Sequence, residues 1–459
     1  MDPKTMKTAV KMPELIADNL KKVGSKLKKI GAVLVPVLVV LVLASTAAVG
    51  TAAQSDARPR ARDIGIDIGI FKPGPLNAIT DVKDVKVGQV TLIEGEGALV
   101  PGKGPVRTGV TAILPHGGNL FNDKVPAAAF VLNAFGKTTG LEQLNELGNL
   151  EVPIVLTNTL NVPLVADAVI QWSLEKNPEI GIKTGTVNPV VGEVNDGTLN
   201  DIQGRHVTKE DVFQAINSAK SGPVEEGAVG AGTGSTCMSF KGGIGTSSRV
   251  LPEKLGGYTV GVLVQTNFGG SLMINGAPVG RAMGKYDFSK YFPYEIPSTA
   301  YVPPADSLAD NPADELGGSC MVVVATDAPL DQRQLERVAK RVALGLACTG
   351  FYSSNGSGDF FIAFSTAQRV PHNTGLTLDT TVVANDSMSS IFQATEEATE
   401  EAVINSILKA TTVVGRDGNT SAAIDIQKLE SILHKYNAVD WDTHLAPWGK
   451  SWGKSWGNS

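Results

Sequence analysis

Apolar residues along the chain recur with two different periods, and each period predicts its own kind of element. Short runs that alternate or stay apolar, rich in β-branched side chains, are typical of strands. Apolar residues three or four positions apart predict amphipathic helices. The expected strands are 85–93, 106–114, 127–133, 153–157, 258–267, 320–325 and 360–364, and the expected helices are 164–174, 209–219, 328–346 and 395–409, with 422–436 as a last strand or helix.

Two of the expected helices also carry end signals. Thr208 and Asp211 are spaced as a capping-box pair before 209–219. Acidic residues fill the first half of 395–409 and Lys409 closes it, an order that suits the helix dipole. Strands and helices are mixed without a regular βαβ order, so the pattern predicts an α+β or layered αββα body rather than a Rossmann sheet.

The first 53 residues have a different pattern from the rest. Residues 1–29 are rich in lysine, 30–43 are uncharged and apolar, and 44–53 are small. This order is typical of an export signal. The alternative is a retained membrane anchor, because the uncharged stretch reaches Gln54 and is long enough to span a bilayer. Either way we expect an exported protein, periplasmic or secreted, with 30–53 as its possible membrane contact.

The remaining chain divides into a linker, one large body and a tail. Residues 54–63, rich in arginine, are interpreted as a linker, and the body is expected to cover 64–440. The tail, 441–459, repeats Trp-Gly-Lys-Ser, is too short to fold alone, and has no assigned function. The segment 271–314, which precedes the strand at 320, reads as a long irregular surface segment.

Composition narrows the class of protein. The chain has 459 residues, 42% of them hydrophobic, and a net charge of −6, so it can bury a large core and is a poor candidate for binding nucleic acid. Three cysteines without a CxxC pair argue against a disulfide framework and a zinc site. The five histidines show no metal-ligand spacing, so no metal is expected.

Glycines gather in the segment 227–249. Such a loop can cradle phosphate with its backbone amides. The phosphate-binding pattern GxxxxGK[ST] is absent, however, because Lys241 is followed by glycine. Close packing of backbone segments is therefore the favoured interpretation.

A Gly-Gly-Ser sequence at 317–319 opens the apolar strand 320–325. A serine at the start of a strand, behind flexible glycine, can act as a nucleophile if a neighbouring group activates it. The alternative is an ordinary turn before a strand. Cys320, next to Ser319, would point to the opposite face of the strand and is interpreted as core.

Several ordered motifs around this serine resemble one family, the DmpA-type aminopeptidases, which include L-aminopeptidase/D-amidase-esterases and β-peptidyl aminopeptidases. The resemblance runs from about residue 63 to about 435. The motifs are Gly74-Pro-Leu-Asn-Ala-Ile-Thr-Asp81, Pro189-Val-Val-Gly-Glu193, Leu199-Asn-Asp-Ile202, Lys241-Gly-Gly-Ile-Gly-Thr-Ser-Ser-Arg249, Ala325-Thr-Asp-Ala-Pro-Leu330 and Ser357-Gly-Asp359.

The resemblance implies a four-layer αββα sandwich like that of N-terminal-nucleophile hydrolases, with different strand connectivity. It implies that the chain cuts itself between Gly318 and Ser319. The products would be an α chain ending at Gly318 (body residues 64–318) and a β chain beginning at Ser319 (319–440), which stay associated. A homo-oligomer is also expected from the resemblance.

The resemblance also assigns roles to individual residues. Ser319 matches the nucleophile, and Ser357 with Asp359 matches the serine and acid that support it. Asn267 matches the asparagine that stabilises the oxyanion. Taken alone, Ser357-Gly-Asp359 would read as a tight turn and Asn267 as a strand-end cap. After self-cleavage Ser319 would own a free amine, whose pKa of roughly 8 suits a general base near neutral pH.

Two further positions concern the substrate. Glu193 matches the acid that receives the substrate's free amino group, although alone it would read as a surface acid. Asn195 stands where some members carry a tyrosine beside the active site, which bears on substrate preference. The resemblance assigns no role to His116 or His206.

The sequence therefore predicts a self-processing serine aminopeptidase or amidase, without metal or organic cofactor, acting on short peptides, amino-acid amides or esters. The preference for L, D or β residues stays open. One alternative is an acyltransferase like the ornithine acetyltransferases, which use threonine where this chain has Ser319. The other is an uncut envelope protein that keeps the fold as a binding module.

Overall fold

A computed structural model describes residues 58–291, 317–373 and 375–441. The expected export segment and all but the first residue of the expected tail lie outside these ranges. Among the described residues, no helix is both long and apolar enough to cross a membrane.

The first of two large sheets has four strands in the order β1-β2-β5-β6, and only its β5–β6 pair is parallel. Two helices, α3 (Val162–Lys176) and α4 (Lys209–Asn217), pack on it. The capping box of Thr208 and Asp211 at the start of α4 is confirmed. The strands are β1 (Lys86–Glu94), β2 (Val106–Leu114), β5 (Ile154–Asn158) and β6 (Val190–Val194).

The second sheet has seven strands, with the order β13-β3-β12-β11-β10-β9 and β4 paired to β3. Helices α6 (Gln332–Cys348) and α7 (Ser389–Leu408) pack on it and on each other. The strands are β3 (Asp123–Ala134), β4 (Asn149–Leu150), β9 (Ile244–Val250), β10 (Thr259–Asn267), β11 (Gly317–Thr326), β12 (Gly356–Ser365) and β13 (Val370–Pro371).

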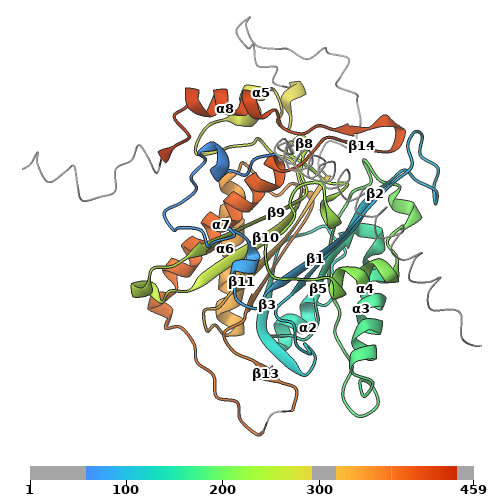
Figure 1. The fold of residues 1–459 in the computed structure, drawn as a ribbon, viewed down its shortest axis with the longest axis vertical. Coiled ribbons are helices and arrows are strands. Elements are labelled where there is room, and N and C mark those ends of the chain that lie inside the picture. The colour runs from blue at the N-terminus through green and yellow to red at the C-terminus, as the bar shows by residue number, and fades with distance from the viewer. Residues whose placement is uncertain (1–57, 292–316, 374, 442–459) are drawn as a thin grey trace, which may run out of the picture. The chain divides into compact units, whose positions relative to one another are not determined.

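The layers stack as helices, sheet, sheet and helices, so the expected αββα sandwich is confirmed (Figure 1). The alternation along β11 shows why. Met321 and Val323 lie in the core between the two sheets, whereas Cys320 and Val322 lie in the core under α6 and α7. Successive strand residues point to opposite faces, so a strand that is apolar on both faces must be covered on both. Cys320 is core, as expected.

Small elements complete the described body. The segment 422–436 resolves as a helix, α8. These elements are α2 (Leu141–Leu147), α5 (Val279–Met283), α8 (Ile426–Lys435), the pair β7 (Thr236–Cys237) and β8 (Phe240–Lys241), and the pair β14 (Val413–Val414) and β15 (Thr420–Ser421).

The segment interpreted as a linker belongs to the body from Arg58 onward. The Arg58 guanidinium donates to the carbonyls of Leu408 and Ile424, at 2.7 and 2.6 Å. Ala61 is fully buried, and its N–H donates to the side chain of Asn405 at 2.9 Å. Arginines suggested a solvated linker, but guanidinium groups also satisfy buried carbonyls.

Helix α7 differs from its prediction in its start and in the role of its acids. It begins at Ser389, before the expected residue 395. Glu397 and Glu401 are buried and form ion pairs with Arg249 of β9, at 3.1 and 2.8 Å. These acids therefore bind a buried cation on the neighbouring sheet, rather than simply complementing the helix dipole.

Candidate active site

Ser319 lies near the beginning of β11, at the point where the chain enters the sheet. Its side chain is on the same face as Met321, toward the first sheet, and it is 3% exposed. The hydroxyl donates to the carbonyl oxygen of Gly318 at 2.5 Å. The hydroxyl thus lies against the carbonyl group of the bond that the resemblance marks for cleavage.

Asn267 is the last residue of β10 and the direct antiparallel partner of Ser319. Directly paired residues on neighbouring strands project from the same face, with Cβ atoms about 5 Å apart. The Asn267 amide is held from two sides, because Oδ1 accepts from the Thr236 N–H and Nδ2 donates to the Asn195 carbonyl, both at 2.9 Å. These contacts set which end of the amide can donate.

Ser357 and Asp359 lie on β12, whose parallel register places Ser357 beside Gly318. A Cβ atom added to Gly318 would be 3.2 Å from Ser357 Oγ, so this hydroxyl adjoins the same bond. The reading of Ser357-Gly-Asp359 as a tight turn is wrong, since the strand already begins at Gly356. The strand formed by the apolar run 360–364 begins earlier than the run itself and includes these small residues.

Asp359 accepts two hydroxyl hydrogen bonds and is fully buried. Ser357 donates to its Oδ1 at 2.6 Å, and Ser353 donates to its Oδ2 at 2.5 Å. Burial raises the pKa of Asp359, while the bonds from Ser353 and Ser357 oppose that rise. The carboxylate is therefore placed to orient the Ser357 hydroxyl.

Glu193 lies on β6 of the opposite sheet and is 1% exposed, so its reading as a surface acid is wrong. The Thr159 hydroxyl donates to one carboxylate oxygen, and the Lys137 N–H donates to the other at 2.9 Å. Burial raises the pKa of Glu193, and both hydrogen bonds lower it in part. Met321 of β11 lies against the adjacent Gly192, which brings β6 next to the strand of Ser319.

Asn195 contributes to this region through its backbone. Its carbonyl accepts from Asn267, whereas its exposed side chain accepts from the Gly197 N–H at 3.0 Å. Its side chain is thus engaged in a local turn. A contact of that side chain with substrate stays a prediction.

Sequence reasoning missed three of the groups around these residues. Thr159 bonds Glu193, Ser353 bonds Asp359, and the N–H of Thr236 bonds Asn267. No local pattern predicts them, because one is a backbone group and the others are ordinary serine and threonine hydroxyls. The histidines are engaged with other partners: His116 with the Asp123 carbonyl and His206 with Asp201.

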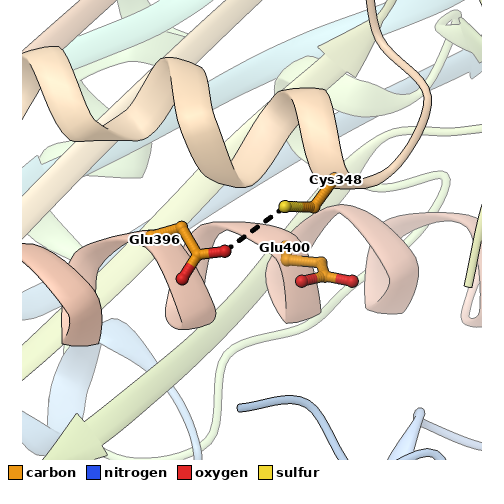
Figure 2. A group of neighbouring side chains, drawn as sticks. All are labelled: Cys348, Glu396 and Glu400. Carbon is orange, nitrogen blue, oxygen red and sulfur yellow. Dashed lines mark hydrogen bonds between the residues drawn. The ribbon is translucent and has the colours of Figure 1, made fainter. Parts of the chain in front are cut away.

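Within the described ranges, one group of side chains has the proximity needed to hold a metal ion: Cys348 of α6 with Glu396 and Glu400 of α7 (Figure 2). No spacing of residues along the chain predicts this group. The exposed thiol of Cys348 donates to Glu396 at 3.3 Å. One exposed cysteine beside two glutamates is not by itself a metal site, and we assign this group no role.

Comparisons with known proteins agree on one family. Residues 77–421 match the model of peptidase family S58. The chain is 45% identical to a β-peptidyl aminopeptidase, BapA, from Sphingosinicella microcystinivorans, over 84% of this chain and 94% of that one.

Solved structures give the same result. A β-aminopeptidase from Burkholderia sp. matches with a TM-score of 0.71 and 38% identity, covering 82% of this chain and 99% of that one. The L-aminopeptidase D-Ala-esterase/amidase from Ochrobactrum anthropi matches with a TM-score of 0.73 and 36% identity, covering 83% and 100%. That structure is described as a new variant among the Ntn hydrolase fold.

Proposed function

Because this chain belongs to peptidase family S58, we propose that it is a serine aminopeptidase that activates itself by cleavage between Gly318 and Ser319. The observation that carries the proposal is the convergence on this bond of Ser319, its strand partner Asn267, and Ser357 beside Gly318. Three neighbouring strands of one sheet bring together a nucleophile, an amide donor and a supporting hydroxyl.

Self-cleavage starts at the Ser319 hydroxyl. Its oxygen attacks the carbonyl carbon of Gly318 and the C–N bond breaks. The nitrogen of Ser319 takes up the proton that leaves the hydroxyl and becomes a free amine. The resulting ester is hydrolysed by water, which releases a carboxylate at Gly318 and the free hydroxyl and amine of Ser319. The contact between Ser319 Oγ and the Gly318 carbonyl supports this first step.

Substrate hydrolysis then uses the new amine as general base. It takes the hydroxyl proton while Ser319 Oγ attacks the substrate carbonyl, and Asn267 Nδ2 donates to the oxygen that becomes negative. The leaving amine takes the proton and an ester on Ser319 remains. Water attacks this ester, restores the hydroxyl and releases the acid. Asp359 accepts a hydrogen bond from the Ser357 hydroxyl and so orients this hydroxyl beside the reacting groups.

Removing the Asn267 amide should slow this chemistry selectively. We expect Asn267→Ala to lower kcat by about 10²–10³-fold with KM changed only a few-fold, because the donor acts on charge that develops in the transition state. Steady-state kinetics on an aminoacyl-p-nitroanilide measure both values. Asn419→Ala is the matched control, since Asn419 also donates to a carbonyl, Thr198 O at 2.9 Å. A normal kcat for Asn267→Ala would remove Asn267 from the mechanism.

Glu193 should govern recognition of the substrate's ammonium group. We expect Glu193→Gln to reduce kcat/KM for substrates with a free amine by roughly 10–100-fold, through KM, because a charge-assisted bond is lost. For N-acetylated substrates, which lack the ammonium group, kcat/KM should be the same in the wild type and in Glu193→Gln. The exposed Glu253→Gln serves as control.

The pH dependence of Glu193 has a definite sign. Because burial raises the pKa of Glu193 above its ordinary 4.5, the wild-type enzyme should lose affinity for the ammonium group as pH falls through that raised value. The Gln variant should lack this acid limb in kcat/KM. An identical limb in both proteins would exclude Glu193 as the amine receptor.

The two chains should remain associated after cleavage. Strand β11 of the new β chain pairs with β10 of the α chain from Val260–Thr326 to Asn267–Ser319, and β12 pairs with β3. Separation would break both ladders and open both cores. Export, membrane contact through 30–53 and a homo-oligomer stay predictions, testable by fractionation and by light scattering.

The substrate class follows from the relatives. We propose short peptides, amides and esters with a free amino terminus, and among these N-terminal β-amino-acyl residues first, since the relative that is 45% identical is named a β-peptidyl aminopeptidase. Parallel assays on β-homo- and α-aminoacyl-p-nitroanilides decide between them.

N-terminal sequencing and intact mass of the purified protein test the proposal as a whole. The expected result is two fragments, of which the smaller begins at Ser319. One uncut chain without activity would instead support a binding module. Two fragments that turn over N-acetylornithine but no peptide amide would support an acyltransferase.

A further inference from the structure

The amide of Asn267 depends on two backbone segments that are distant in sequence. Thr236 N–H and the Asn195 carbonyl hold opposite ends of the amide. Exchanging the amide's oxygen and nitrogen would point like groups at one another, so only one orientation satisfies both contacts. Nδ2 carries a second hydrogen, and this is the hydrogen that the proposed mechanism directs at the oxyanion.

A buried lysine forms hydrogen bonds that hold the segment carrying Thr236. Thr236 of β7 pairs with Lys241 of β8, and the Lys241 side chain is fully buried. Its ammonium donates to the carbonyls of Gly232 and Gly242, at 3.0 and 2.7 Å. A lysine is almost never fully buried without a compensating role, because removing its charge from water is costly. The ammonium ties both ends of the glycine-rich segment that includes Thr236.

The segment that carries Asn195 is backed by a buried acid. Asp196 is 1% exposed, and its Oδ1 accepts from Asn200 at 3.0 Å. A Cβ atom added to Gly234 would lie 2.7 Å from Asp196 Cβ and 2.2 Å from the Arg107 carbonyl, so the two segments are in direct contact and only glycine fits.

The two buried groups, Lys241 and Asp196, are both perturbed by their burial. Burial lowers the pKa of Lys241 to about 7, and the neighbouring Cys237 and Asp196 oppose that shift. Burial also raises the pKa of Asp196 to about 7. The glycine-rich segment 232–242, which the sequence left with no function beyond close packing, therefore contains a fully buried lysine in the hairpin that carries the Thr236 N–H.

We propose that Lys241 is a positioning residue for the Asn267 amide: its ammonium fixes the hairpin 232–242, so that the Thr236 N–H holds the amide in the orientation that the oxyanion requires. The inference rests on the proposed function of Asn267. Lys241 touches neither the substrate nor Ser319 in this scheme and acts only through Thr236.

A double-mutant cycle tests this inference. Lys241→Met keeps an unbranched side chain that is shorter by only the ammonium group, and removes the charge and its two hydrogen bonds. We expect kcat to fall about 10–100-fold with KM within about 2-fold, because a misplaced donor loses part of the ~10²–10³-fold contribution of the intact donor. In an Asn267→Ala background, where no amide remains to be positioned, Lys241→Met should change kcat by less than about 3-fold.

Lys285→Met is the matched control for this cycle. Lys285 Nζ donates to the Ser239 carbonyl at the turn of the same hairpin, at 3.1 Å, and is partly exposed. It should leave kcat within about 2-fold. All variants are assayed after self-cleavage is complete, and the rate of cleavage itself gives a second readout of the same oxyanion donor.

Each outcome decides the proposal. Equal effects of Lys241→Met in both backgrounds, or an effect on KM alone, would overturn the positioning role while leaving the aminopeptidase intact. A wild-type protein that neither cleaves itself nor hydrolyses peptides would instead overturn the proposed function. If Lys241→Met does not fold, Asp196→Asn, which keeps the acceptor for Asn200, enters the same cycle. Failure of both variants to fold places these residues in stability alone and rejects the inference.

Discussion

Ser319→Ala should be recovered as one uncut chain with peptide-amide hydrolysis reduced by about 10⁴-fold or more, because both reactions start from the same hydroxyl. The fold should persist. The serine buries little apolar area, and alanine leaves the pairing of β11 with β10 and β12 unchanged. Intact mass measures the first effect, steady-state kinetics measures the second, and a thermal melt checks the fold.

The matched control for this substitution is Ser387→Ala, at an exposed serine of the same chain. It should be processed and active like the wild type. Fragments beginning at residue 319 in the Ser319→Ala protein would show that another protease cuts the bond. Undiminished hydrolysis by that protein would show that Ser319 is not the nucleophile.

Arg249→Met should destabilise the body by about 3–5 kcal/mol, because it removes a buried cation from the carboxylates of Glu397 and Glu401. Arg249 is fully buried and pairs with Glu397 and Glu401, and it also donates to the Ile68 carbonyl at 3.0 Å. Burial raises the pKa of Glu401, but Arg249 and Arg62 more than offset this and hold it below its ordinary value. Urea unfolding in the Ser319→Ala background, which we expect to be uncut, measures the change.

The sign of the pH effect gives this prediction a second check. With Arg249 present, the lowered pKa of Glu401 stabilises the fold above the unfolded pKa, and this stabilisation is lost as pH falls through the lowered value. Without Arg249 the charged, buried carboxylate of Glu401 destabilises the fold, so its protonation at low pH restores part of the variant's free energy of unfolding. The deficit of Arg249→Met should therefore be larger at pH 8 than at pH 5.

Lys340→Met is the control for charge loss at the surface. Lys340 pairs with Glu336 one helical turn away, at 2.6 Å, but the two side chains are 41% and 34% exposed. We expect a change within about 0.5 kcal/mol. A similar small value for Arg249→Met would mean that its carboxylate partners are neutral in the folded protein.

Much of the fold and of the candidate site could be predicted without coordinates. The alternation in 258–267 and the apolar run 320–325 identified two strands of the second sheet. The order of strands and helices predicted an α+β or layered αββα body, and the family resemblance implied the four-layer αββα sandwich. Ser319, Asn267, Ser357, Asp359 and Glu193 were named through a family resemblance, and the structure brings the first four to neighbouring strands.

Other features could not be predicted because their signal is not local. Arg58 and Arg62 looked like linker charges, yet both bond to groups more than 300 residues away. The acids near the start of α7 suit the helix dipole whether they are exposed or buried, so the dipole argument could not predict their burial. Ser357-Gly-Asp359 has turn-forming residues, but the ladder with β11 holds it as strand. In each case tertiary contacts overrode a weak local preference.

Periodicity and residue type are properties of neighbours along the chain, so they suffice to identify which segments become strands and which serine follows a flexible glycine. The orientation of the Asn267 amide, the burial of Glu193 and the pairing of Arg249 depend on distances between segments far apart in sequence. Those distances exist only once two sheets and their helices have packed, because burial is what gives a charge or an amide a single satisfied arrangement.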